Sequence, residues 1–410
     1  MAEMKYEHPL KYYTVDNFID ESRKLIGLPV HGVMDAPTYE AAGRHVIRGY
    51  ATALGDVNPL YQDVVYAVDS TRYGTVIAPP TILILFKYPL YEGALYDGPY
   101  PLVGLEAGFD WEWNDVVKMN DRFTSELVLT DVYERPSDKG RTVYLVSECK
   151  YRNALSKELV ATCRGTYAAI ARAESITEIP DAITEGFRKY PITDRKLYHS
   201  TDEEVARLIK DIKGMVRRGH NPLYWEDINV GDNLPQVVKG PLTVADLMAY
   251  YGICVSDSAF PRFELAFRKW RTKPGFLRTN YKTGWPYEVQ MTDYLDPHLA
   301  EARGMPYVFA MGSLRAGFCA HLLSNWMGDD GFIRRLNVNV LEPYIYGDAL
   351  WMKGKVVETY KEKLGGTKYG AIDVKIEAVN QLGLNVAPGT ATVYLPIPPE
   401  YNAVKLPILP

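Results

Sequence analysis

Segments with a two-residue alternation of side chains constrain the fold more than any other feature of the sequence. In the first half, three such segments are rich in Val, Thr, Tyr and Leu: 123–133, 142–153 and 158–170. In the second half we expect strands again at 334–341, 349–360, 369–380 and 390–395. A period near two is typical of strands with one buried face. Because helical patterns precede each group of strands, the sequence predicts an α+β fold with helices segregated from antiparallel sheets.

The two halves of the chain repeat one order of elements. Each contains a helix, a polar turn with Asp near Pro, an apolar run and then several antiparallel strands. Between the halves, a helix is expected over 201–216, with three acidic residues in its first turn. We therefore predict an ancient duplication, with an N-terminal domain at 1–175, a helical connector at 176–222 and a C-terminal domain at 223–410.

A polar turn follows the second helical pattern of the first half. Asp56, Asn58 and Tyr61 fall within six residues, and Asn58-Pro59 marks a turn. An acid, an amide and a phenol on one turn are suited to holding a water molecule or a carbonyl group. Asp and Asn also commonly cap helices and turns, so a purely structural role is the competing interpretation.

The composition of the chain excludes several classes of function. The 410 residues are 47% hydrophobic and carry a net charge of -5, so we predict a globular protein that does not bind nucleic acid. No apolar run of about 20 residues predicts a membrane span. The four cysteines lack metal-binding spacing, which predicts no metal site and a reducing, cytoplasmic compartment. The 31 tyrosines indicate partly hydrated cavities or interfaces, where an apolar ring and a polar hydroxyl are both useful.

The polar turn resembles the signature of a known family. The run Gly55-Asp-Val-Asn-Pro-Leu-Tyr-Gln-Asp63, continued by Ala67, Gly74 and 77–79, is similar to the hydration motif of MaoC-like acyl dehydratases and (R)-specific enoyl-CoA hydratases. The first half most resembles the fungal fatty-acid-synthase-type dehydratase domain, and the resemblance covers nearly the whole chain. It implies a double hotdog, in which each domain wraps an antiparallel sheet around a long helix. It also implies an acyl-CoA substrate, no separate cofactor and a homodimer.

The resemblance assigns roles to residues of the first copy. In the family, an Asp and a His five residues later act on one water, an Asn helps to position them, and a backbone amide at a helix start polarises the thioester carbonyl. Here the Asp is Asp56, the Asn is Asn58, and the His position holds Tyr61. Pro80 occupies the position of the carbonyl donor and has no N–H. Because the N-terminal copy shapes the acyl tunnel in many two-domain relatives, we expect catalysis in the C-terminal copy.

The second copy of the motif matches the family less closely. Tyr294 takes the His position, and Asp296 aligns with the second Asp of the motif. His298 is either a substitute proton carrier, under a shifted loop register, or a surface residue. Asp257 is the candidate for the missing acid, and the N–H of Gly312 is the best candidate donor to a thioester oxyanion.

Basic residues near the second copy are candidates for substrate binding. Arg268, Lys269 and Arg271 suit the phosphates of coenzyme A, although a solvated loop or an oligomer contact explains them equally. Arg315 would meet an acidic substrate group or coenzyme A, or form an ion pair. His321 lies on an apolar helix face, so we expect it to pack in the core.

Three functions are consistent with these features. The leading hypothesis is a hydro-lyase that hydrates an enoyl-CoA or dehydrates a 3-hydroxyacyl-CoA. The second is a different enzyme on the same scaffold, catalysing another addition, elimination or thioester hydrolysis, because the motif His is Tyr in both copies. The third is a catalytically degenerate acyl-binding subunit.

Overall fold

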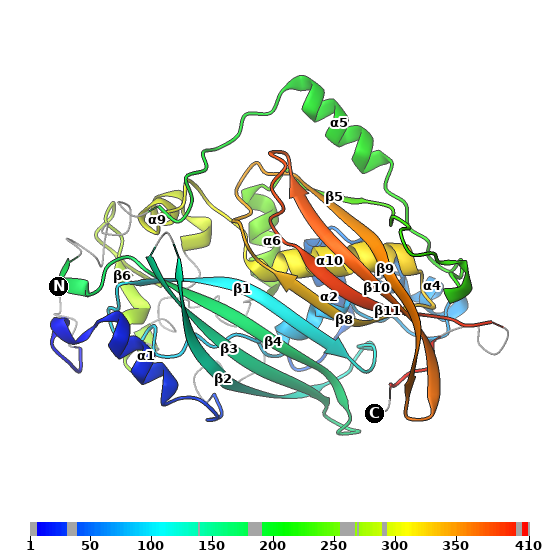
Figure 1. Cartoon of the computed structure of the whole chain (residues 1–410), viewed down its shortest axis with the longest axis horizontal. Helices are drawn as coiled ribbons and strands as arrows, with labels where there is room; N and C mark the ends of the chain where they lie inside the picture. The colour runs from blue at the N-terminus through cyan, green and yellow to red at the C-terminus, as the bar shows by residue number, and fades with distance from the viewer. Residues whose placement is uncertain are drawn as a thin grey trace.

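The computed structural model describes residues 6–30, 39–137, 140–178, 191–254, 267–268, 270–288, 293–398 and 404–408. Its main feature is one nine-stranded antiparallel sheet in the order β2-β3-β4-β1-β8-β11-β10-β9-β5 (Figure 1). The strands are β1 Leu102–Trp113, β2 Phe123–Ser137, β3 Gly140–Asn153, β4 Leu159–Ala171, β5 Val237–Lys239, β8 Phe332–Asn339, β9 Leu350–Leu364, β10 Thr367–Asn380 and β11 Gly389–Leu395. All seven strands predicted from alternation are confirmed.

The two halves join through a single pair of strands. β1 pairs with β8 over five residues, from Gly108 opposite Asn339 to Glu112 opposite Arg335. Four strands of the first half, β1 to β4, thereby continue into four strands of the second, β8 to β11. This repeat of a four-stranded antiparallel unit with helices on one side confirms the α+β class and the double hotdog.

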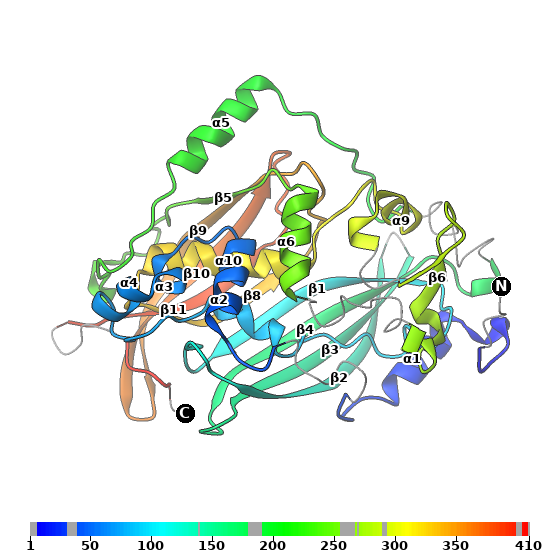
Figure 2. The same cartoon turned by 180° about the vertical axis from the view of Figure 1, so that it is seen from behind.

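One long helix lies at the centre of the molecule. α10, Gly312–Met327, is buried at all sixteen positions. Figures 1 and 2 show it against the strands of the second half, with α2 (Arg44–Ala53), α3 (Pro59–Gln62) and α6 (Val244–Cys254) on its other side. Layers on both sides of α10 bury its polar residues, such as Arg315 and His321, together with its apolar ones.

The first half contains only a short helix in the corresponding place. The apolar run of the first half forms the 3-10 helix η2, Pro80–Leu85. Pro79 and Pro80 fix the entry of the chain, and a 3-10 turn is the usual form of such a short piece. The long helix expected in each domain is therefore present in the second half and reduced in the first.

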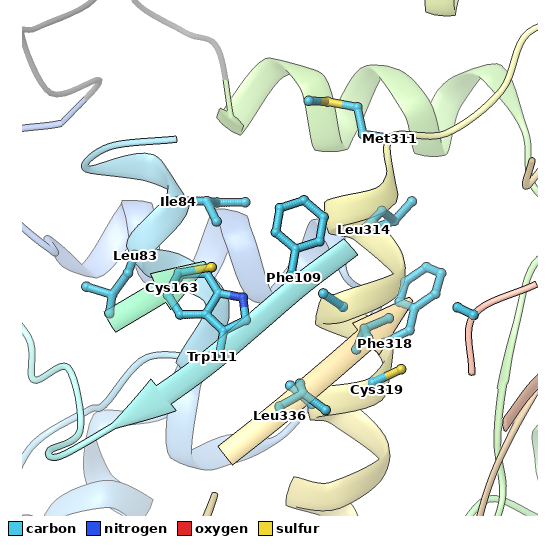
Figure 3. Close-up of a cluster of buried hydrophobic side chains, with 14 of the residues drawn as sticks. Leu83, Ile84, Phe109, Trp111, Cys163, Met311, Leu314, Phe318, Cys319 and Leu336 are labelled. Atoms are coloured by element: carbon cyan, nitrogen blue, oxygen red, sulfur yellow. The ribbon is translucent and has the colours of Figure 1, made fainter. Parts of the chain in front are cut away.

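Aromatic side chains of β1 fill the seam between the halves. Trp111 and Trp113 lie on one face of the strand, and their rings stack with centroids 5.2 Å apart. Figure 3 shows Phe109 and Trp111 beside Leu314 and Phe318 of α10. Each of these side chains is at most 5% exposed. The two halves thus share one hydrophobic core.

The remaining helices and short strands lie around this core. They are η1 Leu10–Tyr12, α1 Val15–Arg23, α4 Val64–Asp69, η3 Ile176–Glu178, α5 Asp202–Lys213, η5 Trp225–Asp227, η7 Pro274–Phe276, β6 Leu277–Thr279, β7 Pro286–Glu288 and α9 Pro297–Ala302. None of the described helices is long and apolar enough to cross a membrane.

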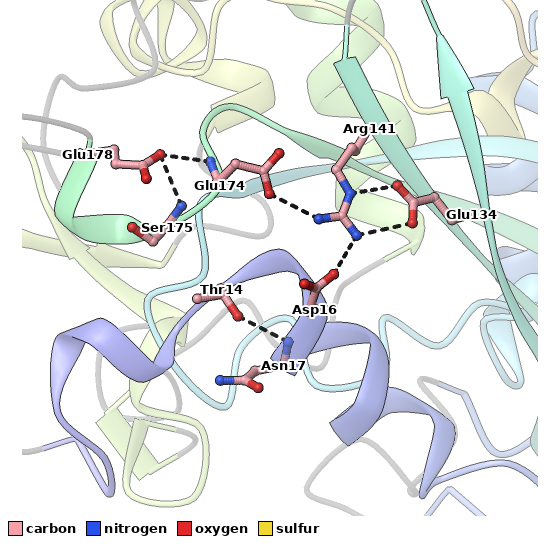
Figure 4. A network of polar contacts seen from close by, with 8 residues as sticks. All are labelled: Thr14, Asp16, Asn17, Glu134, Arg141, Glu174, Ser175 and Glu178. Atoms are coloured by element: carbon pink, nitrogen blue, oxygen red, sulfur yellow. Dashed lines mark hydrogen bonds and ion pairs between the residues drawn. The ribbon is translucent and has the colours of Figure 1, made fainter.

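An arginine on β3 fastens α1 to the sheet. Arg141 contacts Glu134 of β2 and Asp16 of α1, both at 2.6 Å, and Glu174 beyond β4 at 3.0 Å (Figure 4). Thr14 caps the same helix by accepting a hydrogen bond from the backbone N–H of Asn17. The resulting network attaches a terminal helix by polar contacts at the surface.

Two segments outside the sheet form short helices. The chain after Asn58-Pro59 forms α3 and α4, which are separate because Asp63 leaves the helical conformation and caps α4 through the N–H groups of Val65 and Tyr66. The segment 223–232 contains the 3-10 helix η5. The predicted connector helix is confirmed as α5, with a capping box between Thr201 and Glu204.

Candidate functional site

The polar turn after α2 is a rigid, buried structure. Asp56 and Asn58 are 1% and 2% exposed. The carboxylate Oδ1 of Asp56 accepts a hydrogen bond from the N–H of Asn58 at 3.0 Å, and Asn58 Oδ1 accepts from the N–H of Leu60 at 3.1 Å. Gly55 permits the turn because its φ is +61°, in the left-handed region. The capping role expected of this turn is therefore present at Asn58, the N-cap of α3, and both polar side chains are buried.

A histidine from the other half of the molecule approaches this carboxylate. His321, on α10, places Nε2 3.5 Å from Oδ1 of Asp56. Its Nδ1 lies 2.6 Å from Nζ of Lys239, the last residue of β5. The same Nζ donates to the carbonyl oxygens of Leu54, at 2.6 Å, and Gly55, at 3.2 Å. Lys239, His321 and Asp56 thus form a buried chain, which we call the buried triad.

Burial shifts the pKa of each member of the triad in the direction that favours its neutral form. It raises the pKa of Asp56 to about 6, although the charge of Lys239 opposes the rise. It lowers the pKa of Lys239 to about 8, against the attraction of Asp56. The pKa of His321 is held well below its usual value by burial and by the charges of Lys239 and Arg217, which outweigh a hydrogen bond with Asn325. A carboxyl group with a pKa near 6 suits acid–base chemistry at neutral pH.

Tyr61 connects the triad to a small pocket. Its side chain is 4% exposed and hydrogen bonds with Ser324, one turn after His321 on α10. Burial first, then the nearby charge of Asp56, raises the pKa of Tyr61 well above its usual value, so the phenol stays neutral. A pocket of about 30 Å³ adjoins both residues. Its lining also includes Asn58, Leu60, Tyr73, Ile77, Ala78, Pro80, Trp113, Asp115, Val116, Val117, Met327, Gly328, Asp329, Gly331, Phe332 and Ile333.

The second copy of the motif has a different arrangement. Tyr294 is 5% exposed, and its ring packs against Phe309 at 4.5 Å and Tyr251 at 5.5 Å. Asp296 caps α9 by accepting from the N–H groups of His298 and Leu299, while the His298 side chain is exposed. The structure therefore separates the three predicted residues into a packed ring, a cap and a surface side chain.

A buried ion pair lies beside this second copy. Arg303 Nη1 is 3.3 Å from Oδ2 of Asp293, and both side chains are at most 5% exposed. The guanidinium also donates to the carbonyl of Gly104 on β1 and lies over the ring of Tyr294. Burial raises the pKa of Asp293 to about 6, although Arg303 pulls it down. This arginine ties the second motif to the sheet of the first half.

The predicted oxyanion donor already has an acceptor within the chain. The N–H groups of Gly312 and Ser313, at the start of α10, hydrogen bond with the carboxylate of Glu106 on β1, the latter at 2.8 Å. Tyr88 donates its hydroxyl to the same carboxylate. A Cβ on Gly312 would lie 2.9 Å from Cγ2 of Val340 and 3.0 Å from Oε2 of Glu106, so a larger residue here would require these side chains to shift. Glu106 therefore caps α10 from another strand and interacts favourably with its dipole.

Removing this cap should destabilise the fold measurably. We expect Glu106→Ala to lower the free energy of unfolding by about 1–2 kcal/mol, because two helix N–H groups lose their acceptor. Glu106→Gln keeps one carbonyl acceptor and should lose less. Urea denaturation of the purified variants measures both changes. An Ala variant as stable as the wild type would contradict the capping role.

The predicted coenzyme A residues do not converge in the described part of the chain. Arg315 is 3% exposed and donates to the carbonyl of Glu342, and burial lowers its pKa to about 10. Arg268 and Arg271 are exposed. Asp257 and Lys269 lie outside the described residues. In the described ranges no cluster of three or more His, Cys, Asp or Glu side chains could hold a metal ion.

Sequence reasoning missed three residues of these clusters. His321 was expected only to pack in the core; it is indeed 4% exposed, yet it also contacts Asp56 and Lys239. Neither Lys239 nor Glu106 stands in a motif, since each reaches its partners from a distant strand. A lysine at the end of an otherwise apolar segment, Val237-Val-Lys239, was the one local signal available.

Comparisons with known proteins agree with this architecture. The family model of the FAS1-like dehydratase domain region matches residues 30–162. A UPF0336 protein of Parafrankia sp. is 30% identical over 138 residues, which are 32% of this chain and 83% of that protein. A UPF0336 protein of Streptomyces avermitilis is 28% identical over 137 residues, 33% of this chain and 79% of that protein.

Solved structures extend the likeness to the whole chain. The structure of a MaoC-like dehydratase, 21% identical, covers 92% of this chain and 100% of that chain with a TM-score of 0.60. A MaoC domain protein of Chloroflexus aurantiacus J-10-fl, 13% identical, covers 88% and 93% with a TM-score of 0.51. The continuous sheet and the motif turn thus define a double-hotdog protein. The chain belongs to the family of the UPF0336 proteins. Its residues 30–162 match the FAS1-like dehydratase domain region, and its fold is that of the MaoC-like dehydratase structures.

Proposed function

We propose that this protein is a hydro-lyase that adds water to, or removes it from, an acyl-CoA thioester at the motif turn of the first half. The observation that supports this proposal is the buried Asp56 carboxyl, whose pKa is about 6 and which lies 3.5 Å from His321 Nε2. An Asp and a His, the pair that the family uses, therefore lie close together here, although the His comes from α10 and not from the motif. This contact supports a site in the N-terminal copy, whereas the sequence had led us to expect catalysis in the C-terminal copy.

The proposed reaction uses Asp56 as the proton carrier. In hydration, the ionised carboxylate takes a proton from water while the water oxygen forms a bond to C3 of the enoyl thioester. The electron pair of the double bond moves toward C2 and the thioester oxygen, and C2 then receives the proton. Dehydration reverses these steps. Asn58 and the neutral Tyr61 hydroxyl would orient the water, and coenzyme A enters only as part of the substrate.

The pocket beside Tyr61 agrees with an uncharged acyl group. Apolar side chains such as Trp113, Met327 and Phe332 line it, and no Lys or Arg does. Its two carboxylates, Asp115 and Asp329, would repel an acidic acyl end. Assembly as a homodimer belongs to the same proposal.

Purified full-length protein tests the function directly. Loss of the conjugated enoyl absorbance with a 2-enoyl-CoA, and its appearance with the 3-hydroxyacyl-CoA, is the expected result. Release of free thiol without hydration would instead favour thioester hydrolysis. Binding of acyl-CoA by calorimetry without turnover of any of these substrates would favour an acyl-binding subunit.

A further inference from the structure

Lys239 reaches the motif turn from the far edge of the sheet. It ends β5, whose three residues are buried and pair with β9 at one end of the described sheet. The side chain is 7% exposed, and Nζ lies 5.0 Å from the ring centre of Phe318 on α10. An ammonium ion in such a place requires acceptors for all its protons, because an unpaired donor in the interior is strongly unfavourable.

The acceptors around Nζ match its donors in number. An ammonium group has three N–H donors and no acceptor. Three acceptor atoms lie within 3.2 Å: the carbonyl oxygens of Leu54 and Gly55, and Nδ1 of His321. With the carbonyls taking two protons, Nδ1 takes the third through its lone pair. A neutral imidazole that accepts at Nδ1 carries its own proton on Nε2, and Nε2 is the atom that faces Asp56.

We propose that Lys239 is a positioning residue that holds His321 in the tautomer with its proton on Nε2, directed at the Asp56 carboxylate. This inference rests on the proposed function only for its effect on turnover. In this arrangement His321 is a donor and not a base, so the proton exchanged with substrate resides on Asp56 alone. The carboxylate thereby receives two donors, His321 and the N–H of Asn58, which leave Oδ2 as its reactive oxygen.

A second cation near the triad, Arg217, affects the pKa values of Asp56 and His321 in the same direction as Lys239 does. Arg217 donates to the carbonyl of Val57 at 2.9 Å, and its charge lowers the pKa of both Asp56 and His321. Tyr61, the other titratable group of the turn, stays neutral. Lys239 is nevertheless the larger electrostatic contribution to the pKa of Asp56. Removing its charge should therefore move that pKa upward.

Nitrogen NMR of ¹⁵N-histidine-labelled protein tests the tautomer without any substrate. The His321 signals, assigned by their loss in His321→Gln, should show a protonated Nε2 and an unprotonated Nδ1 in the wild type. In Lys239→Met the preference should disappear or reverse. Lys355→Met, which removes an exposed lysine from the neighbouring strand β9, should leave the signals unchanged. A protonated Nδ1 of His321 in the wild type would overturn the proposal even if Lys239→Met does not fold.

Turnover supplies a second readout. We expect Lys239→Met to reduce kcat about 10- to 100-fold with little change in KM, as for partners that orient a reacting group. The acidic limb of its pH profile should move to higher pH. Equal profiles for Lys239→Met and the wild type would refute the positioning role. If the wild type turned over no acyl thioester, the proposed function would fail, while the NMR result would still decide the role of Lys239.

Discussion

The Asp56→Asn variant is expected to lose about 10²- to 10⁴-fold in turnover of an acyl thioester and yet to gain stability. Asparagine keeps the Oδ1 acceptor for the N–H of Asn58 and occupies the same volume, but it carries no proton to exchange. The loss should appear in kcat, because the change removes the reacting group and not the pocket. A variant with full activity would show that the proton carrier lies elsewhere.

The gain in stability follows from the pKa of the buried carboxyl. Its folded value of about 6 lies above the value of about 3.9 for an unfolded chain. The ionised form therefore disfavours folding, and this contribution develops as pH rises from about 4 to 6. The two values correspond to about 2–3 kcal/mol above pH 6. Asp56→Asn should be more stable than the wild type by that amount at pH 8, and equally stable near pH 4.

Asp63→Asn provides the matched control for this variant. Asp63 undergoes the same chemical change seven residues away, but it is exposed and caps α4, a role that asparagine fills equally well. Its stability should change by less than about 0.5 kcal/mol at either pH. Thermal or urea denaturation at the two pH values makes the comparison.

The second large effect is expected at the ion pair of the C-terminal motif. Arg303→Met should lower the free energy of unfolding by about 3–5 kcal/mol, because Asp293 would remain buried without its partner. The adjacent carbonyl of Gly104 would lose a donor as well. Part of the loss should be recovered on acidification, since protonation of Asp293 removes the unpaired charge.

A double variant separates the pair from simple loss of packing. Arg303→Met combined with Asp293→Leu should regain about 1–3 kcal/mol over Arg303→Met, because an apolar pair of similar volume replaces the ions. The exposed pair Lys375–Glu377 is the control, and Lys375→Met should change stability by less than about 1 kcal/mol. A double variant no better than the single one would indicate that Asp293 is stabilised by groups other than Arg303.

Seven of the nine strands of the sheet were predictable from sequence because the information lies in neighbouring residues. Alternation in segments such as 142–153 encodes a buried face locally, and the motif at Asp56 to Tyr61 resembles the signature of a family without reference to any other segment. Capping at Asp296 follows equally from its position before Pro297. These features need no knowledge of which distant segments meet.

The buried triad could not be predicted in this way. Lys239 lies 184 positions from Gly55 and 82 from His321 along the chain. His321 has the helical spacing of a core residue, and it does lie in the core. Its contacts with Asp56 and Lys239 depend on the position of α10 in the fold, which local spacing does not encode. The N–H of Gly312, predicted as a donor to substrate, is instead bound by Glu106, and this could not be predicted for the same reason. Glu106 lies 207 positions before Ser313 in the sequence.

The pairing of β1 with β8 also has a consequence for synthesis on the ribosome. Roughly 160 residues separate the end of β4 at Ala171 from the start of β8 at Phe332. At about 5–20 residues per second, the β1 edge waits on the order of 10–30 s for its partner. An open strand edge of that kind invites pairing with other nascent chains. Asp110 and Glu112, which alternate with the aromatic residues of β1, give the waiting edge a negative charge that discourages such pairing.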